Sequence, residues 1–417
     1  MMPLTPYAKK VMKRCEKLAQ FSQHPDYIDR RYLTKEHKNA NLQVAKWMQQ
    51  AGMRTWQDEA GNQWGSYRSS SPNAKSLIIG SHLDTVPDSG KYDGILGVLL
   101  PISLVQYFHD HKQSLPFHLD IVAFADEEGT RFGTTLLGSR AVAGTWQEKW
   151  GCLRDSDDIN LSSAMREFGL DINKIHAAAR SVDDTMGFLE IHIEQGPVLE
   201  SRGLPVGVVD GIAGAKRFEI SVVGHAGHAG TVPMELRQDA LAGSAQMIVM
   251  IEKAAKEHGV VATVGQIHSS SNAVNVINGN VVFSLDVRSL DNQKRDRCID
   301  EIMNAIEHIA GYRGLDAKIR MTHDADATHC DKMLMDELRI ACENSGIEPF
   351  NLSSGAGHDA MAIADLCPVA MLFVRCAKGI SHHPSEAVTF EDVLNAMLVA
   401  RSFIELKART CEHELVA

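Results

Sequence analysis

The chain has 417 residues, 44% of them hydrophobic and 23% charged, which is enough for two or more globular domains. Its 42 basic and 53 acidic residues give a formal net charge of −11, which argues against a binder of nucleic acids or anionic membranes, since both need a basic surface. Residues 1–20 lack the apolar core of a signal peptide, and no apolar run reaches the roughly 18 residues of a membrane span. The eight cysteines are scattered and form no C-x-x-C pair. A cytoplasmic protein with reduced thiols is therefore expected.

The first part of the chain alternates helices with short apolar strands. The N-terminal stretch is expected to be helical to about Gln50, where Ala51 and Gly52 end the helix. Short strands are expected at 53–56 and 62–67, buried strands at 76–80 and 118–125, and a buried helix at 94–109. This alternation predicts an α/β sheet with helices on both faces.

The middle of the chain has a different pattern. Strands are expected at 216–223, 260–268, 280–287 and 316–322, and helices at 240–256 and 290–310. The resulting order of strand, helix, strand, strand, helix, strand is that of a ferredoxin-like α+β fold. Its outer strand could be solvated or could pair with a second subunit.

After residue 330 the α/β pattern resumes. A helix is expected at 331–344, an apolar strand at 368–374 and a closing helix at 390–406. The simplest interpretation is one α/β domain, formed by residues 1–212 and 330–417, that is interrupted by a smaller α+β domain at 213–329.

The first candidate cluster follows the buried strand that ends near residue 80. His82 emerges at the carboxyl end of this strand, where ligands bind in open α/β sheets. Asp84 could orient the imidazole, and Asp93, just before the buried helix, could bridge two cations. A His-x-Asp pair alone is more often part of a solvated surface loop.

Three adjacent carboxylates, Asp126, Glu127 and Glu128, follow the next buried strand. They repel one another unless cations neutralise them, although a solvated acidic turn explains this motif equally well. Because adjacent side chains tend to point apart, one glutamate could bind a metal while its neighbour faces a water molecule.

Two further clusters contain histidines. Glu190, His192 and Glu194 lie on one face of an expected strand, which suits a metal ligand with supporting carboxylates. His382 and His383 follow an apolar strand and precede a proline. Either histidine could have a structural role; the more specific hypothesis is that one of them is a metal ligand.

The four clusters together make a stronger case than any one of them, because each lies at the end of an expected strand. Ligation by carboxylate and imidazole without cysteine suits zinc, manganese or cobalt rather than a structural zinc–cysteine site.

Several motifs together resemble a known family. They are Ser-His-Leu-Asp-Thr-Val at 81–86, Asp-Gly at 93–94, Glu-Glu-Gly at 127–129, His-Ile-Glu-Gln-Gly at 192–196, His-Ala-Gly-Thr at 228–231, Gly-Ala-Gly-His-Asp at 355–359 and Ile-Ser-His at 380–382. They resemble the metal-dependent peptidase family M20, and within it the amidase/carbamoylase branch, over about residues 40–400. The resemblance implies a mixed-sheet, metallopeptidase-like catalytic domain with an inserted lid domain through which the protein forms a homodimer.

The resemblance also implies how the clusters divide their work. Two divalent cations, zinc or manganese or else cobalt, would be ligated, one by His82, Asp93 and His192 and the other by Asp93, Glu128 and His382. Glu127 would be the general base that takes a proton from water and passes it to the leaving amine. The Ile-Ser-His pattern favours His382 over His383.

Further residues are implied to contact the substrate. His228 would stabilise the oxyanion, often across the dimer in this family, with Asn275 nearby, and Arg288 would clamp a substrate carboxylate. The ureido group would be contacted by Gln195, Gly357 and His358. Taken alone, Arg288 is more often in a surface ion pair and Asn275 in a turn, and His225 with His228 could belong to a glycine-rich metal tract.

The chain departs from the family pattern at three positions, none of them a proposed ligand. Ser89 stands for a glycine, Val232 for a threonine and Asn278 for a proline. Val232 lies in the substrate-side loop, so the substrate is the least determined part of the prediction.

The expected function is hydrolysis of a ureido substrate that carries a carboxylate. The first candidate is allantoate, converted to ureidoglycine or ureidoglycolate with release of ammonia and carbon dioxide in purine catabolism. The alternatives are an N-carbamoyl-L-amino-acid hydrolase or β-ureidopropionase, and a binding or regulatory homologue without activity. The expected partners are this small molecule and a second subunit, with no nucleic acid and no membrane.

Overall fold

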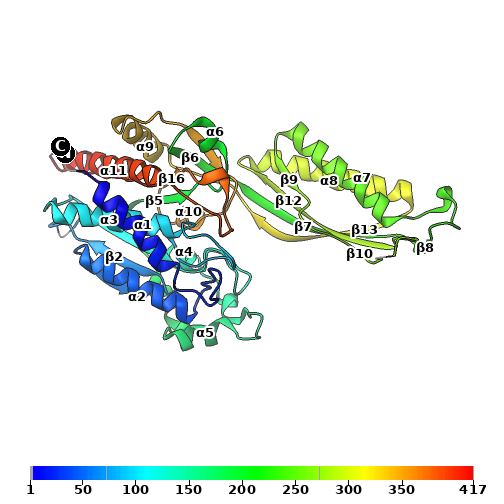
Figure 1. Ribbon diagram of the computed structural model, residues 1–417, viewed down its shortest axis with the longest axis horizontal. Helices are drawn as coiled ribbons and strands as arrows, with labels where there is room; N and C mark the ends of the chain where they lie inside the picture. Colours follow the sequence, from blue (N-terminus) through cyan, green and yellow to red (C-terminus); the bar gives the residue numbers. More distant parts are fainter. Residues whose placement is uncertain (1–2, 72, 272, 417) are drawn as a thin grey trace. The chain divides into compact units, whose positions relative to one another are not determined.

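The computed structural model describes residues 3–71, 73–271 and 273–416, with side chains described as far as residue 411. The chain forms two compact units (Figure 1). Unit 1 comprises Met1–Asp210 and Cys330–Ala417, and unit 2 comprises Gly211–His329. Unit 2 is thus inserted into the chain of unit 1.

Unit 1 is built on a mixed sheet of nine strands in the order β1-β2-β4-β3-β5-β16-β6-β14, with β15 also paired to β6. The strands are β1 (Arg54–Gln57), β2 (Gln63–Tyr67), β3 (Ser76–His82), β4 (His118–Phe124), β5 (Thr185–Ile193), β6 (Val206–Ile212), β14 (Thr328–His329), β15 (Asn351–Ser354) and β16 (Val369–Val374). The central strands β4, β3, β5 and β16 are parallel to one another. Their carboxyl ends therefore meet at one edge of the sheet, where ligands bind in α/β proteins.

Helices cover both faces of this sheet, as the sequence predicts. They are α1 (Thr5–Leu18), α2 (Lys35–Gln50), α3 (Ile95–Asp110), α4 (Leu137–Val142), α5 (Leu161–Phe168), α6 (Val198–Arg202), α9 (Lys332–Asn344), α10 (Ala360–Ile363) and α11 (Phe390–Val416). Short 3-10 helices are η1 (Glu148–Cys152), η2 (Ile172–Ala178) and η4 (Ala377–Gly379). None of the helices in the described part of the chain has the length and apolar character needed to cross a bilayer.

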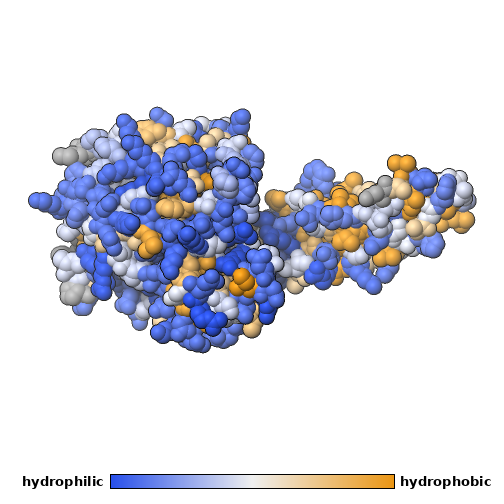
Figure 2. Space-filling model, turned by 60° about the horizontal axis from the view of Figure 1, so that its bottom comes forward, coloured by the Kyte–Doolittle hydropathy of each residue, from blue (hydrophilic) through white to orange (hydrophobic). Residues whose placement is uncertain are grey.

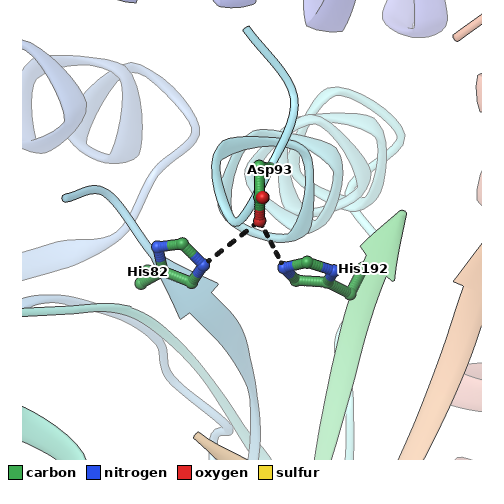
Figure 3. Close-up of side chains that lie close together, drawn as sticks. All are labelled: His82, Asp93 and His192. Carbon is green, nitrogen blue, oxygen red and sulfur yellow. Dashed lines mark ion pairs between the residues drawn. The ribbon is translucent and has the colours of Figure 1, made fainter. Parts of the chain in front are cut away.

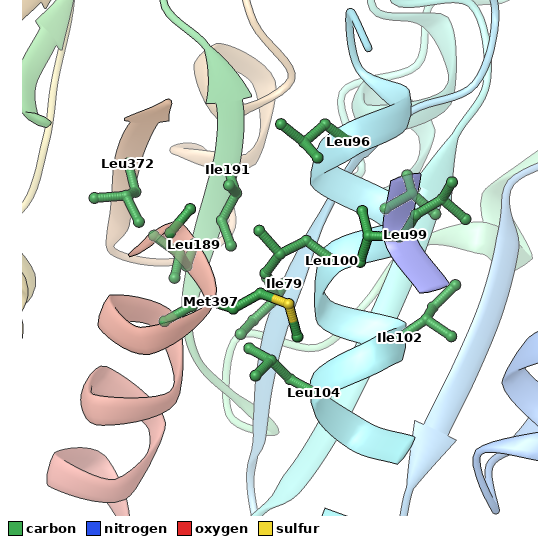
Figure 4. Packing of buried hydrophobic residues seen from close by; sticks show 14 of the residues in the cluster. Ile79, Leu96, Leu99, Leu100, Ile102, Leu104, Leu189, Ile191, Leu372 and Met397 are labelled. Atoms are coloured by element: carbon green, nitrogen blue, oxygen red, sulfur yellow. The ribbon is translucent and has the colours of Figure 1, made fainter. Parts of the chain in front are cut away.

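The main core of unit 1 lies on the face of the sheet that α3 and α11 cover (Figure 4). Leu100 of α3 and Met397 of α11 pack near Leu189 and Ile191 of β5 (Figure 4). Because side chains alternate along a strand, the intervening residues of β5 point to the opposite face, towards α10. The apolar core thus fixes a strand whose other face carries polar groups of the site.

The N-terminal region contains two helices, so the expectation of a helix continuing to about Gln50 is wrong. The predicted end at Ala51 is confirmed, but α1 already ends at Leu18 and α2 begins at Lys35. The fully buried Arg30 lies between them, and its Nη1 donates to the carbonyl oxygens of Leu18 (2.8 Å) and Phe21 (3.0 Å). This side chain donates hydrogen bonds to carbonyl groups at and just after the end of α1, where the helix itself no longer supplies N–H donors.

Unit 2 contains an antiparallel sheet in the order β10-β12-β7-β13, in which β9 also pairs with β12. Its elements are β7 (Gly214–Val223), β8 (Gly227–His228), η3 (Met234–Leu236), α7 (Ala240–His258), β9 (Val261–Thr263), β10 (Ile267–Ser269), β11 (Val276–Ile277), β12 (Asn280–Ser289), α8 (Asn292–Arg313) and β13 (Asp316–Ala325). The helices α7 and α8 pack together against the sheet (Figure 1). This is the predicted ferredoxin-like order of elements.

One strand of unit 2 differs from its prediction. Residues 260–268 form two strands, β9 and β10, instead of one, although both pair with β12. Between the pairs Thr263↔Asp286 and Ile267↔Phe283, residues 264–266 oppose only residues 284–285. The extra residue interrupts the ladder as a bulge does.

Large apolar side chains are exposed over the surface of unit 2 (Figure 2). They include Met234, Leu236, Val249, Val261, Ile267, Tyr312 and Met321. Such exposure is common for single residues and gains meaning only where the residues form a contiguous surface.

Candidate metal centre

The candidate ligands lie at the carboxyl ends of the four parallel strands. His82 is the last residue of β3, Glu127 and Glu128 follow β4, and His192 is near the end of β5. His382 follows β16 and η4. Parallel pairing of these strands therefore gathers residues that are up to 300 positions apart in the sequence.

The carboxylate of Asp93 lies at the centre of the cluster. Its Oδ1 is 3.0 Å from Nε2 of His192 and 3.6 Å from Nε2 of His82, and both rings point towards it (Figure 3). Its other oxygen, Oδ2, is 3.1 Å from Nε2 of His382, which is in turn 3.5 Å from Oε1 of Glu128. Each oxygen of one carboxylate thus faces a different set of donors.

Three groups of potential metal donors result among the described residues, and within each group the donor atoms lie within 4.8 Å of one another. The groups are His82, Asp93 and His192; His82, Glu127 and Glu128; and Asp93, Glu128 and His382. Asp93 and Glu128 each belong to two groups, so the arrangement suits two neighbouring cations that share a carboxylate.

Gly94 makes the close approach of His82 and Asp93 possible. It has a left-handed backbone (φ 71°), and a Cβ atom placed on it would lie 2.4 Å from Cε1 of His82. A side chain at this position would be strained and would displace the imidazole. Glycine in the Asp-Gly motif therefore leaves space for the imidazole of His82 and also allows the turn into α3.

Backbone carbonyl groups orient both buried imidazoles. Nδ1–H of His82 donates to the carbonyl oxygen of Asp84 (3.0 Å), and Nδ1–H of His192 donates to that of Ile193 (2.9 Å). These contacts place the proton on Nδ1 and leave the lone pair of Nε2 directed at Asp93.

The carboxylate of Asp84 holds the acidic turn after β4. It accepts hydrogen bonds from the backbone N–H groups of Glu127 (3.2 Å) and Glu128 (3.1 Å), and it is 3.8 Å from Nδ1 of His82. The sequence predicted that this side chain orients His82; in the structure the backbone carbonyl of Asp84 makes that hydrogen bond, and the carboxylate positions the two glutamates.

The carboxylates of the site carry strongly shifted pKa values. Burial, together with the neighbouring carboxylates, raises the pKa of Glu127 well above its usual value and that of Glu128 to about 7. Asp93 behaves oppositely: although burial opposes it, its close contacts with His192, His382 and His82 hold its pKa well below the usual range.

Divalent cations fit this set of residues. The carboxylate of Asp126 is fully buried and has no hydrogen-bond partner among the described residues, and burial raises its pKa well above its usual value. Asp359 is also fully buried, and burial raises its pKa in the same way. A cluster of buried acids is costly unless positive charge neutralises it, and imidazole and carboxylate donors together suit transition metals.

Some of the left-handed backbone conformations of the chain lie at or beside the candidate ligands. Asp126 (φ 61°), Gln195 (φ 56°) and His382 (φ 55°) all adopt the left-handed region, which residues other than glycine rarely occupy. Strain of this kind is commonly retained at functional sites.

The proposed ureido contacts of unit 1 lie in different surroundings. Nε2 of Gln195 donates to Oδ2 of Asp93 (2.9 Å), so this side chain is part of the cluster. His358 is buried, its Nε2 is 2.8 Å from Oγ of Ser354, and its ring packs edge-on against that of His192 with centroids 4.6 Å apart. Gly357 is exposed.

The remaining substrate candidates lie in unit 2. His228 is exposed in β8, which pairs with β11, and the N–H of Ala229 donates to the carbonyl oxygen of the exposed Asn275 (2.9 Å). Arg288 lies on β12 and makes a two-pronged ion pair with Asp286, through Nε (2.8 Å) and Nη2 (2.9 Å).

Other functional contacts were not predicted. Glu386 and Ser381 contact the Asp93 segment, and neither was assigned a role, although both lie in the 379–386 motif. Glu194 does not support His192, because it accepts hydrogen bonds from the backbone of Val198 and Leu199 at the start of α6.

The fold and the cluster define a class of protein, an α/β domain with a carboxylate-centred metal site at its strand ends and an inserted ferredoxin-like domain. The chain belongs to the peptidase family M20/M25/M40, whose family model matches residues 78–406. This confirms the predicted family and the predicted mixed α/β fold.

The relatives point to one branch of this family. The chain is 39% identical over 428 residues to allantoate deiminase 1 of Glycine max, covering 95% of this chain and 89% of that protein. It is also 39% identical over 386 residues to an N-carbamoyl-L-amino acid amidohydrolase of Geobacillus stearothermophilus, covering 92% and 94%. A solved structure of an amidase of the hydantoinase/carbamoylase family from Burkholderia multivorans matches with a TM-score of 0.90 at 28% identity, covering 96% of this chain and 98% of that one.

Proposed function

We propose that this protein is a dinuclear metal-dependent amidohydrolase that cleaves a non-peptide C–N bond of a ureido compound, with allantoate as its substrate. The Asp93 carboxylate carries the proposal, since its two oxygens face separate sets of donors. Glu127 has a carboxylate oxygen within 4.8 Å of the donor atoms of His82 and Glu128, close enough to act on a water molecule at the site.

The proposed ligands are those predicted from the sequence. One cation would be held by His82, Asp93 and His192, and the second by Asp93, Glu128 and His382. Zinc, manganese or cobalt would polarise the ureido carbonyl and make water more acidic. The exposed His382 would contribute less to cation affinity than the buried histidines.

Glu127 is proposed to move the proton. It takes a proton from the attacking water and delivers it to the nitrogen that leaves, so the carboxylate is regenerated in each turnover. Its backbone N–H is fixed by Asp84, which keeps the carboxylate close to His82 while the proton is transferred.

The substrate contacts expected from the sequence are proposed for each unit by itself. In unit 2, Arg288 would bind the substrate carboxylate, and His228 with Asn275 would stabilise negative charge that develops on the oxygen of the attacked carbonyl. In unit 1, Gln195, Gly357 and His358 would contact the ureido group.

Allantoate is preferred because relatives named allantoate deiminase come from several plants, and the N-carbamoyl-L-amino acid amidohydrolase of equal identity makes that activity the second candidate. Steady-state rates of the manganese-loaded protein on allantoate and on several N-carbamoyl-L-amino acids would decide. Turnover of a carbamoyl amino acid with no turnover of allantoate would replace the first assignment with the second.

A binding protein without activity is the alternative outside enzymology. It predicts that the protein, after loading with Mn²⁺ or Zn²⁺, retains less than about one ion per chain and hydrolyses neither substrate. The presence of Glu127 beside a complete donor set supports the enzyme instead.

The oligomer and the compartment are also proposals. The position of β13 at the edge of its sheet supports a homodimer formed through unit 2, which sedimentation velocity would detect. Six cysteines are buried thiols, which supports a reducing cytoplasm; they are Cys15, Cys298, Cys330, Cys342, Cys367 and Cys376.

A further inference from the structure

Glu386 connects two segments of unit 1 that are almost 300 residues apart. Its Oε1 accepts hydrogen bonds from the backbone N–H groups of Tyr92 (2.8 Å) and Asp93 (3.0 Å). The residue is 4% exposed, so water does not replace these hydrogen bonds. The segment after β16 thereby holds the backbone of the residue at the centre of the cluster.

Ser381 completes the connection at the side chain. Its Oγ is 2.7 Å from Oδ2 of Asp93 and 3.2 Å from Oε2 of Glu386, and it accepts a hydrogen bond from Nε2 of Gln195 (3.1 Å). The single hydroxyl proton serves the shorter contact, to Asp93. The Asp93 oxygen that faces His382 and Glu128 therefore also accepts a hydrogen bond from the neutral hydroxyl of Ser381.

Glycine at position 90 provides the space that this contact needs. A Cβ atom on Gly90 would lie 2.3 Å from Cβ of Glu386. Any larger residue there would push the Glu386 carboxylate away from Tyr92 and Asp93.

We propose that Glu386 and Ser381 are positioning residues that fix the Asp93 carboxylate between its two sets of donors and thereby set the affinity of the site for divalent cations. Neither residue is among the groups expected to bind metal or substrate. The inference rests on the proposed metal site, because it concerns how tightly that site binds its cations.

The test measures Mn²⁺ affinity of the full-length protein by competition with a fluorescent chelator. Glu386→Ala should weaken binding roughly 10- to 100-fold, the range found for groups that orient metal ligands. Glu386→Gln should stay within about fivefold of wild type, because its amide oxygen still accepts both backbone N–H groups. Ser381→Ala should have an intermediate effect, and it gives a second measurement if Glu386→Ala does not fold.

Asp155→Ala is the matched control. One oxygen of Asp155 accepts two backbone N–H groups, those of Asp157 and Ile159, and the other accepts from a side chain, that of Arg131. It therefore loses the same kinds of hydrogen bonds as Glu386→Ala, away from the donor set. Its Mn²⁺ affinity should equal that of wild type even where its melting temperature falls.

Three outcomes would overturn the inference. They are wild-type affinity in folded Glu386→Ala and Ser381→Ala, equal losses in Glu386→Gln and Glu386→Ala, and an equal loss in Asp155→Ala. Failure of the wild-type protein to bind Mn²⁺ would instead contradict the proposed function, so the two failures are distinguishable.

Discussion

The donor cluster of unit 1 and the substrate candidates of unit 2 differ in how firmly the fold holds them. The side chains of His82 and His192 are only 2% and 1% exposed, and backbone carbonyl groups fix both rings. In unit 2, His228 and Asn275 are exposed, and Arg288 already has a counter-ion in Asp286. The candidate metal donors are thus organised in advance by strand ends, whereas the residues proposed to recognise the substrate lie on a more accessible surface.

This difference explains why the chemistry is better determined than the substrate. The cluster needs a narrow set of residues at fixed distances, whereas two relatives of equal identity are named for different substrates. The departure at Val232 lies in unit 2, which also contains the proposed substrate residues His228, Asn275 and Arg288.

Glu127→Gln is expected to have the largest effect on turnover. The amide cannot accept the proton of water, so kcat should fall roughly 10²- to 10⁴-fold. Metal content, measured by plasma mass spectrometry, should stay at the wild-type value. Near-normal kcat in a metal-loaded variant would show that another group is the base.

Replacing His192 and His382 separately compares the buried and the exposed side of the cluster. His192→Ala should weaken Mn²⁺ binding by more than about 100-fold, beyond the range for groups that only support a ligand. His382→Ala should weaken it less, because the side chain is 47% exposed and water can take its place. A greater loss in His382→Ala, measured by chelator competition, would reverse the comparison.

Arg288→Ala tests the contribution of unit 2. Losing a bidentate hydrogen bond to the substrate carboxylate should lower kcat/KM roughly 10²-fold, mostly through KM. Arg217→Ala is the control, since Arg217 is paired with the same aspartate and is half exposed. Equal losses in the two variants would mean that a general change around Asp286 is responsible.

The effect of metal removal on thermal stability should be small and confined to unit 1. At a free-metal concentration of 100 Kd, binding adds about 2.7 kcal/mol of stability, which corresponds to a shift in Tm of roughly 4 °C for a unit of this size. Calorimetry with and without a chelator should show this shift in one transition only. A shift of every transition would mean that unit 2 also depends on the cation.

Much of the fold could be predicted because local patterns determine it. The buried strands β3, β4 and β16 are short apolar runs, and each ends at a polar motif, so the position of the ligands follows from parallel pairing. The alternation of strands and helices in unit 2 likewise indicated its fold.

What could not be predicted depends on contacts between distant segments. The break between α1 and α2 follows from the buried Arg30, whose partners are tertiary. The contact of Glu386 with Asp93 spans 293 positions, and no local pattern distinguishes this glutamate from a solvated one. The different use of the Asp84 carbonyl and carboxylate depends on the path of the chain after β3.

The central claim is that the Asp93 carboxylate lies between two cations. Anomalous diffraction from a crystal of the Mn²⁺-loaded protein tests it most directly. The account predicts two anomalous peaks per chain, one on the His82 and His192 side of Asp93 and one on the Glu128 and His382 side. A crystal with no peak within bonding distance of Asp93 would contradict it.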